Sequence, residues 1–148
     1  MTEFKLHPQL AQDCLLIKDL KLSRLLLMNN SDFPWCILVP RRVALTELHD
    51  LTEADQVQFL HESSSVCRAM QNVFASENHN DQTDKSAGQC GKMNIASLGN
   101  IVPQLHVHHV LRYPHDAAWP KPVWGFAPAT PYAEEHGQLL CEKLASVI

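Results

Sequence analysis

Short apolar runs separated by polar turns occupy the first forty residues of the chain. The runs cover residues 14–17, 25–28 and 36–39, and polar residues 18–24 and 29–32 separate them. Runs of this length that are bounded by Asn, Asp, Ser or Pro are typical of buried strands. The pattern therefore predicts three strands, of which the first two form a hairpin.

A longer segment repeats its apolar residues at helical spacing. It follows Thr52, a favourable N-cap residue, and Asp55 stands three positions later as in a capping box,. Val57 and Leu60 begin the apolar stripe, and a stripe of this kind packs on a core. The pattern predicts a helix over residues 53–75.

Two further helices are expected near the ends of the chain. Pro8 is compatible with the first turn of a short helix over residues 7–12,. Thr130 and Pro131 predict the cap and the first residue of a C-terminal helix over residues 131–146, with Leu139 on or beside its buried face,.

The last two strands follow a polar segment, residues 76–92, which predicts a long surface loop,. Residues 93–96 form a short apolar run, and polar and apolar residues alternate from Gln104 into a strand over 105–111,. Because successive side chains of a strand point to opposite faces, Gln104, His106 and His108 share one face and His109 points away from them.

This alternation places imidazoles where they can act together. Three of the nine histidines fall between residues 106 and 109. Alternate side chains of a strand lie roughly 6.6 Å apart, close enough for two imidazoles to reach different oxygens of one phosphate. An imidazole can be a nucleophile, a general base, a hydrogen-bond donor or a metal ligand. The alternative interpretation is a strand that carries some surface histidines.

The segment from Gln104 to Val110 resembles the signature of the histidine triad (HIT) superfamily, His-φ-His-φ-His-φ-φ with φ apolar. Gln104 stands at the first His position, His106 at the middle one and His108 at the last, while His109 replaces an apolar residue. The resemblance implies that His106 is the nucleophile and His108 a donor to the phosphate. Gln104 can still donate and accept hydrogen bonds, but it cannot titrate near neutral pH.

The order of the predicted elements also resembles this family over residues 10–125. The resemblance implies an α+β fold, a five-stranded antiparallel sheet with a long helix and a C-terminal helix packed on it, in a single domain over residues 1–148. It also implies a homodimer that binds nucleoside monophosphate esters, anhydrides or amidates. Such a protein hydrolyses or transfers the nucleotidyl group.

Three asparagine positions match family positions that contact the nucleotide. Asn94 corresponds to a contact of the phosphate or leaving group, and Asn100 to a polar donor six residues before the nucleophile. Asn29 corresponds to the residue that contacts the ribose, and Asn30 is the alternative for that role. Each of these residues is also a common turn former, which is the interpretation that needs no ligand.

Composition and charge limit the classes of partner and the cellular compartment that we expect for this protein. The chain has 148 residues and a net charge of −4, which argues against non-specific binding of nucleic acid,. Its five cysteines lack metal-ligand spacing and are expected to be free thiols in a reducing compartment,. We find neither a signal peptide nor an apolar run of membrane-spanning length, so we expect a cytoplasmic protein without a membrane partner.

Three hypotheses of function follow. The first is a nucleotide hydrolase or nucleotidyl transferase that acts on a dinucleoside polyphosphate or a nucleoside phosphoramidate through a covalent nucleotidyl-His106, without a cofactor. The second is a non-catalytic nucleotide-binding or interaction protein, because Gln104 departs from the triad. The third is a metal site formed by His106, His108, His109 and His115. Trp119 and Trp124 lie in a Pro-rich segment and could serve packing or substrate contact equally well.

Overall fold

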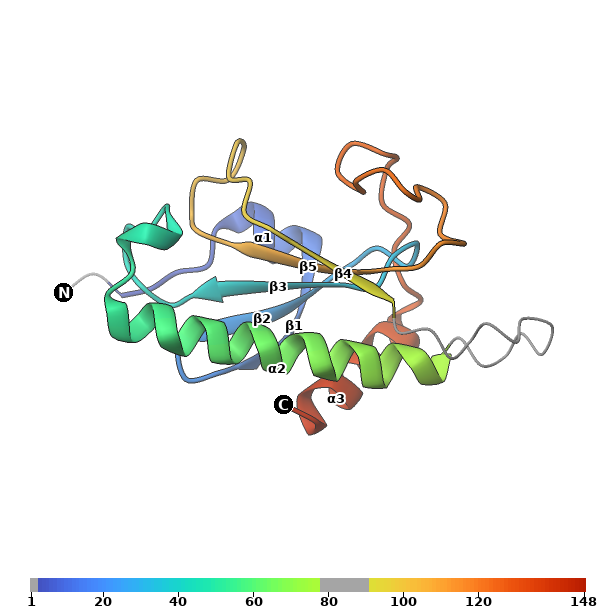
Figure 1. The fold of residues 1–148 in the computed structure, drawn as a ribbon, viewed down its shortest axis with the longest axis horizontal. Helices are drawn as coiled ribbons and strands as arrows, with labels where there is room; N and C mark the ends of the chain where they lie inside the picture. The colour runs from blue at the N-terminus through green and yellow to red at the C-terminus, as the bar shows by residue number, and fades with distance from the viewer. Residues whose placement is uncertain (1–2, 78–90) are drawn as a thin grey trace.

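The protein folds as an α+β structure around one antiparallel sheet, as the sequence predicts (Figure 1). A computed structural model describes residues 3–77 and 91–148. The strands are arranged in the order β1-β2-β3-β5-β4, and every neighbouring pair is antiparallel. In chain order the elements are α1 (Pro8–Asp13), β1 (Cys14–Asp19), β2 (Ser23–Met28), β3 (Trp35–Pro40), the 3₁₀ helix η1 (Leu48–Asp50), α2 (Glu53–Glu77), β4 (Lys92–Ala96), β5 (Val107–Arg112) and α3 (Glu134–Ser146).

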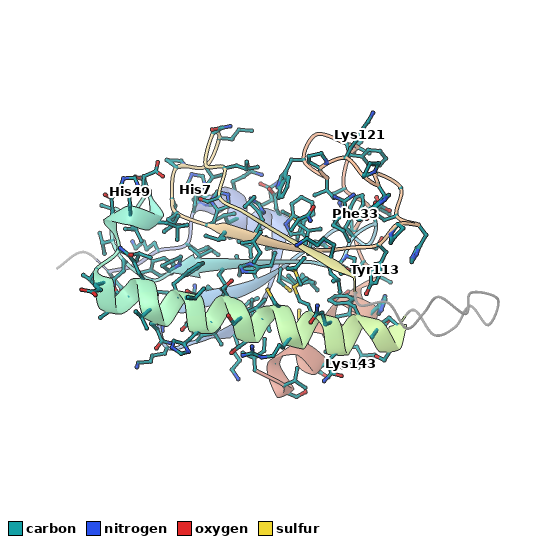
Figure 2. All side chains as sticks on the ribbon, in the orientation of Figure 1. His7, Phe33, His49, Tyr113, Lys121 and Lys143 are labelled. Atoms are coloured by element: carbon teal, nitrogen blue, oxygen red, sulfur yellow. The ribbon has the colours of Figure 1, made fainter. Side chains whose placement is uncertain are left out.

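Each face of the sheet has its own apolar core. The long helix α2 and the C-terminal α3 cover one face, where Leu25, Leu38 and Met70 are fully buried (Figure 1). On the other face α1 and the irregular segment 113–131 pack against β2, β3 and β5. Figure 2 shows Phe33 on this second side, and Lys143 of α3 on the side of α2. The second face is the one that carries the candidate site.

The helix α2 begins at Glu53 as expected, and the hydroxyl of Thr52 accepts a hydrogen bond from the Asp55 N–H at 3.2 Å. The predicted inner stripe is wrong at its start, since Val57 and Leu60 are 54% and 67% exposed. Two polar residues are buried in their place because each finds a partner in the core. Glu62 accepts hydrogen bonds from backbone N–H groups of the β1–β2 turn, and Ser63 pairs with His109.

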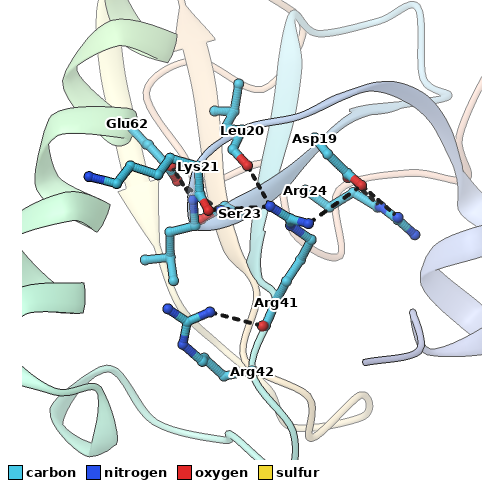
Figure 3. A network of polar contacts seen from close by, with 9 residues as sticks. Asp19, Leu20, Lys21, Ser23, Arg24, Arg41, Arg42 and Glu62 are labelled. Carbon is cyan, nitrogen blue, oxygen red and sulfur yellow. Dashed lines mark hydrogen bonds and ion pairs between the residues drawn. The ribbon is translucent and has the colours of Figure 1, made fainter. Parts of the chain in front are cut away.

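The β1–β2 connection is shorter than the sequence predicts, because the two strands extend to Asp19 and from Ser23. Figure 3 shows the polar contacts that hold this turn. Arg41 donates to the Leu20 carbonyl at 2.6 Å, and Glu62 accepts from the Ser23 N–H at 3.0 Å. Side chains from α2 and from the residue after β3 thereby form the hydrogen bonds that the backbone groups of this tight turn need.

The strand predicted over 105–111 starts two residues late, at Val107. Val107 pairs with Leu38 and His108 with Ala96, and no residue before Val107 has a strand partner. Gln104, Leu105 and His106 therefore precede the sheet, and the Leu105 N–H donates to the Leu45 carbonyl instead.

The C-terminal helix also starts late, at Glu134 after the N-cap Ala133. Thr130 is not its cap, because its hydroxyl donates to Asp32 and its N–H donates to Asn30 Oδ1. Leu139 is 45% exposed, whereas Leu140 and Leu144 are buried.

Cys14, Cys36, Cys67 and Cys141 are free thiols, as predicted, and Cys90 lies outside the described residues. The predicted loop over 76–92 lies mostly outside them too, although α2 extends into it as far as Glu77. Among the helices of the described ranges, none combines the length and apolarity required to span a membrane.

Candidate active site

A cavity of about 620 Å³ lies on the α1 side of the sheet. Six separate stretches of the chain line it: the end of α1, the end of β2 with Asn29 and Asn30, Trp35 at the start of β3, the loop 98–102, His106 and His108 near the start of β5, and the segment 123–131. No lysine or arginine of the described residues lines it, and Asp13 is its one carboxylate there. A cavity of this size fits a ligand as large as a mononucleotide.

His106 lies just before β5, is 6% exposed and lines this cavity. Its Nδ1 lies 2.7 Å from the carbonyl oxygen of Gln104. Because a carbonyl can only accept, the proton must be on Nδ1, and the Nε2 of the neutral ring keeps its lone pair. The backbone two residues earlier thus holds His106 in the tautomer that a nucleophile requires.

His108 has the opposite tautomer. The indole Nε1–H of Trp35 donates to His108 Nδ1 at 3.0 Å, so a neutral His108 carries its proton on Nε2 and can donate it,. Burial, followed by the neighbouring His106 and His109, lowers the pKa of His108 to about 3, so the ring is neutral at pH 7,. The rings of His106 and His108 lie 5.0 Å apart.

His109 lies on the other face of β5, where the strand alternation predicts it. Its Nδ1 contacts the Val107 carbonyl at 3.1 Å and its Nε2 contacts the Ser63 hydroxyl at 2.8 Å. The side chain is fully buried, and burial lowers its pKa to about 4. His109 is therefore a satisfied core histidine beneath α2.

Gln104 does not line the cavity. Its Oε1 accepts the His7 N–H at 2.9 Å, and its Nε2 donates to the Lys5 carbonyl at 2.9 Å. Both ends of the amide therefore hold the segment that leads into α1. The backbone carbonyl of the same residue is the one that holds His106.

Asn29, Asn30 and Asn100 all line the cavity with the two histidines. Asn29 Oδ1 accepts the Tyr132 N–H at 2.9 Å, and Asn30 Oδ1 accepts the Thr130 N–H at 3.3 Å. These bonds use the amide oxygens, so each amide –NH₂ is the group left to donate to a ligand.

Asn94 is not among the residues that line the cavity. It lies on β4, and its Oδ1 accepts a hydrogen bond from Arg112 at 3.2 Å. Arg112 is 1% exposed and forms two further bonds to Asp116, at 2.7 and 3.0 Å. Asn94 therefore belongs to the polar cluster that anchors the segment after β5.

Sequence reasoning gave Trp35 no role in the site and left that of Trp124 open, although both line the cavity. Their rings lie 5.6 and 5.4 Å from the ring of His108. Only the register of the sheet brings Trp35 to the site, because Ile37 pairs with His108 and residues two apart on one strand share a face,. Trp119 instead lies outside the cavity, with the Arg112 guanidinium 5.8 Å from its ring.

The histidines do not form the metal site that was considered as a third hypothesis. His109 lies on the far face, and His115 stacks on Tyr113 at 5.3 Å outside the cavity. In residues 3–77 and 91–148, no three His, Cys, Asp or Glu side chains are grouped closely enough to hold a metal ion.

Comparisons with known proteins agree with this geometry. The family model of the HIT domain matches residues 9–115. A histidine triad protein from Marinobacter aquaeolei VT8 is 40% identical, with a TM-score of 0.86 over 99% of this chain and 96% of the other. A comparison with curated proteins found no match.

Two further solved structures are of the same kind. A histidine triad protein from Bradyrhizobium japonicum is 38% identical, with a TM-score of 0.85 over 99% of both chains. One from Sinorhizobium meliloti 1021 is 34% identical, with a TM-score of 0.84 over 98% of this chain and 97% of the other. With the cavity, the paired histidines and the sheet order described above, these matches show that the chain belongs to the HIT domain family.

Proposed function

We propose that this protein is a nucleotide hydrolase or nucleotidyl transferase that acts on the α-phosphate of a nucleoside monophosphate derivative, with His106 as its nucleophile. The observation that carries the proposal is the hydrogen bond from His106 Nδ1–H to the Gln104 carbonyl. It leaves an unprotonated Nε2 on a buried residue that lines a cavity of nucleotide size. The family resemblance supports a nucleotide as the ligand.

The first step is the attack of His106 Nε2 on phosphorus. The bond from phosphorus to the leaving group breaks, and the leaving group takes the bonding pair and then a proton from water. The imidazole keeps its Nδ1 proton in the nucleotidyl-histidine, where the Gln104 carbonyl stabilises the positive ring,. A water molecule then attacks phosphorus, loses its proton to solvent and releases the mononucleotide and a neutral His106.

Hydrogen-bond donors around the phosphate make this attack feasible, because anionic oxygens repel an incoming lone pair. His108 Nε2–H is one donor, and the neutral state of His108 keeps it a donor without adding a charge. The amide –NH₂ groups of Asn29, Asn30 and Asn100 are further donors that line the cavity. Asn29 and Asn30 also follow β2 at the place where the resemblance implies the ribose contact.

The charge of the cavity favours some leaving groups over others. A polyphosphate leaving group carries several negative charges, which proteins neutralise with Arg, Lys or a bound cation. No described Lys or Arg lines the cavity, Asp13 does, and the apolar Leu98 and Ile101 line it while being 46% and 91% exposed. We therefore propose a nucleoside phosphoramidate or a simple ester as the substrate in preference to a dinucleoside polyphosphate.

A substrate panel with the purified protein tests the proposal. Adenosine and guanosine phosphoramidates should be turned over faster than the corresponding dinucleoside polyphosphates, and protein denatured at alkaline pH, where the phosphorus–nitrogen bond to histidine is stable, should carry the nucleotidyl group on the peptide that contains His106. His106→Ala should abolish turnover and leave mononucleotide binding within about tenfold, because one lost contact is worth about 1.4 kcal/mol or less.

His108→Ala should weaken both binding and turnover, since the donor acts before and during the reaction. His49→Ala is the matched control, because that side chain is 82% exposed and lies outside the cavity. Full turnover by His106→Ala would eliminate the covalent mechanism.

The second candidate is a nucleotide-binding protein without turnover. It is favoured by Gln104, whose amide is engaged with the backbone of Lys5 and His7 and so lies outside the cavity. Tight mononucleotide binding with no turnover of any substrate in the panel would identify this candidate.

A further inference from the structure

We propose that Trp35 is a positioning residue that fixes the tautomer of His108, so that His108 always presents Nε2–H, and never a lone pair, to the ligand in the cavity. The kinetic part of this proposal rests on the proposed function. The tautomer itself can be measured in the free protein.

The hydrogen bond from Trp35 allows only one tautomer of a neutral His108. The indole Nε1–H can only donate, and it lies 3.0 Å from His108 Nδ1 in a buried position,. A neutral imidazole has one N–H and one lone pair, so a lone pair on Nδ1 requires the proton on Nε2. Both rings are more than nine-tenths buried, at 7% exposure for Trp35 and 5% for His108, so water does not compete for this bond.

Sheet packing holds the donor in place. Trp35 is the first residue of β3 and pairs with Val110, while Ile37, two residues later, pairs with His108. The ring of Trp124 meets the ring of Trp35 edge-on at 5.9 Å and that of His108 at 5.4 Å. The indole is therefore packed against Trp124 as well as bonded to His108 Nδ1.

The other tautomer would oppose the reaction. In that tautomer the Nδ1–H would point at the indole N–H, and the two donors would repel each other. The unprotonated Nε2 would then direct its lone pair at an anionic phosphate oxygen, which it also repels. Two neighbouring histidines would then present lone pairs to the same group. Trp35 thus separates the two roles: His106 attacks and His108 donates.

Two-bond ¹H–¹⁵N correlation spectra of protein labelled at histidine test the tautomers directly. In the wild-type protein at pH 7, His108 should show a protonated Nε2 and an unprotonated Nδ1. His106 and His109 should show the reverse, because each directs its Nδ1 at a backbone carbonyl. Those two rings are internal controls in the same spectrum, and a His108 protonated on Nδ1 would overturn the proposal even if no variant folds.

Variants then assign the effect to the N–H of Trp35. Trp35→Phe keeps an aromatic ring and removes the donor, so His108 should show a mixture of tautomers while His106 and His109 are unchanged. Trp124→Phe is the spectroscopic control, because no hydrogen-bond partner is found for its Nε1 among the described residues, and it should change no tautomer. An unchanged His108 spectrum in Trp35→Phe would refute the assignment.

The kinetic consequence is separate. Trp35→Phe should lower kcat/KM about 3- to 10-fold, the loss expected when one well-oriented hydrogen bond is weakened. Trp119→Phe, the same change outside the cavity, should leave kcat/KM within about twofold. If no substrate is turned over even by the wild type, the proposed function fails, while the spectra still decide the role of Trp35.

Discussion

At the scale of single residues, the atom that meets Nδ1 decides what each histidine can do. A carbonyl fixes Nδ1–H in His106 and His109, and an indole N–H fixes the lone pair in His108. His106 and His109 share a tautomer but lie on opposite faces, so only His106 reaches the cavity. Tautomer and face together therefore distinguish His106, the proposed nucleophile, from the other two histidines, and residue identity alone does not.

Burial of neutral histidines predicts how stability depends on pH. Burial lowers the pKa of His108 from 6.5 to about 3 and that of His109 from 6.5 to about 4. Just below pH 6.5 these two side chains are therefore protonated in the unfolded chain but not in the folded protein. Their contribution to stability is complete above pH 6.5 and is lost as the pH falls towards 4. Between pH 6 and 5, the free energy of unfolding measured by urea titration should fall by about 2–3 kcal/mol per pH unit.

Substitutions show how much each of the two histidines contributes to this dependence of the unfolding free energy on pH. His109→Gln should remove about one proton from the linkage, or about 1.4 kcal/mol per pH unit. His49→Gln should leave the slope unchanged, because that side chain is exposed in the folded protein. An equal slope in His109→Gln and the wild type would mean that His109 is not neutral and buried.

Gln104 connects His106 to the N-terminal segment. Gln104→Ala removes the bonds to the Lys5 carbonyl and the His7 N–H, so it should lower stability by about 1–2 kcal/mol in thermal denaturation and slow turnover,. Gln104→His restores the usual triad residue but keeps at most one of these bonds, so it should be intermediate in stability and change the rate modestly. A melting temperature of Gln104→Ala equal to that of the wild type would show that this connection is not stabilising.

At the scale of elements, the sequence predicted every strand and α-helix of the described residues but not the 3₁₀ helix η1, and local signals misplaced several ends. The strand with the histidines starts at Val107 and not at residue 105, because β4 ends at Ala96, opposite His108, and the Leu105 N–H donates to the Leu45 carbonyl and not to β3. Thr130 looks like a helix cap, yet it bonds to Asn30 and Asp32, a hundred residues away in sequence. Element ends depend on distant partners that a local pattern does not contain.

The irregular segment after β5 depends on one buried ion pair. Arg112 and Asp116 are 1% and 9% exposed at their side chains, and Asp116 also accepts the N–H groups of Tyr113 and Ala118. This segment carries Val123 and Trp124 to the cavity. Its position is therefore set by charge pairing as well as by its prolines and tryptophans.

Asp116→Asn should destabilise the protein by about 3 kcal/mol, because it leaves the Arg112 charge buried without its partner. It should also raise KM more than it lowers kcat, since it loosens a wall of the cavity and not the nucleophile. Asp19→Asn is the matched control. It breaks an equally short pair with Arg24, but an exposed one, and should cost less than about 1 kcal/mol,. Equal losses in chemical denaturation would contradict the role given to burial.

At the scale of the whole molecule, the sequence motif placed His106 and His108 together, but the fold adds what surrounds them. Asp13, Trp35 and Trp124 come from three distant segments and meet at the cavity only when the sheet is assembled. Gln104 and Asn94 were matched to family positions by the resemblance, but their side chains bond outside the cavity, to the N-terminal backbone and to Arg112. A motif specifies residue types along one strand, whereas partners across strands require the register of the sheet.

The remaining prediction concerns assembly. β4 is an edge strand whose Ile95 is 51% exposed, and Ile95 pairs with His109 on the α2 side of the sheet. Leu60 of α2 is 67% exposed and lies one turn before Ser63, the partner of His109,. Exposed sheet edges and apolar patches favour association, and a two-fold dimer would bury them twice.

We therefore expect a homodimer, as the family resemblance implies, and expect light scattering at micromolar concentration to give twice the chain mass. Leu60→Glu and Ile95→Lys should each shift the mass towards the monomer, because a charge buried in the interface loses its hydration. Leu139→Glu is the control, since Leu139 is 45% exposed on α3, away from β4. A monomeric wild-type protein would refute the dimer. A dimer that survives both substitutions would place the interface elsewhere on the molecule.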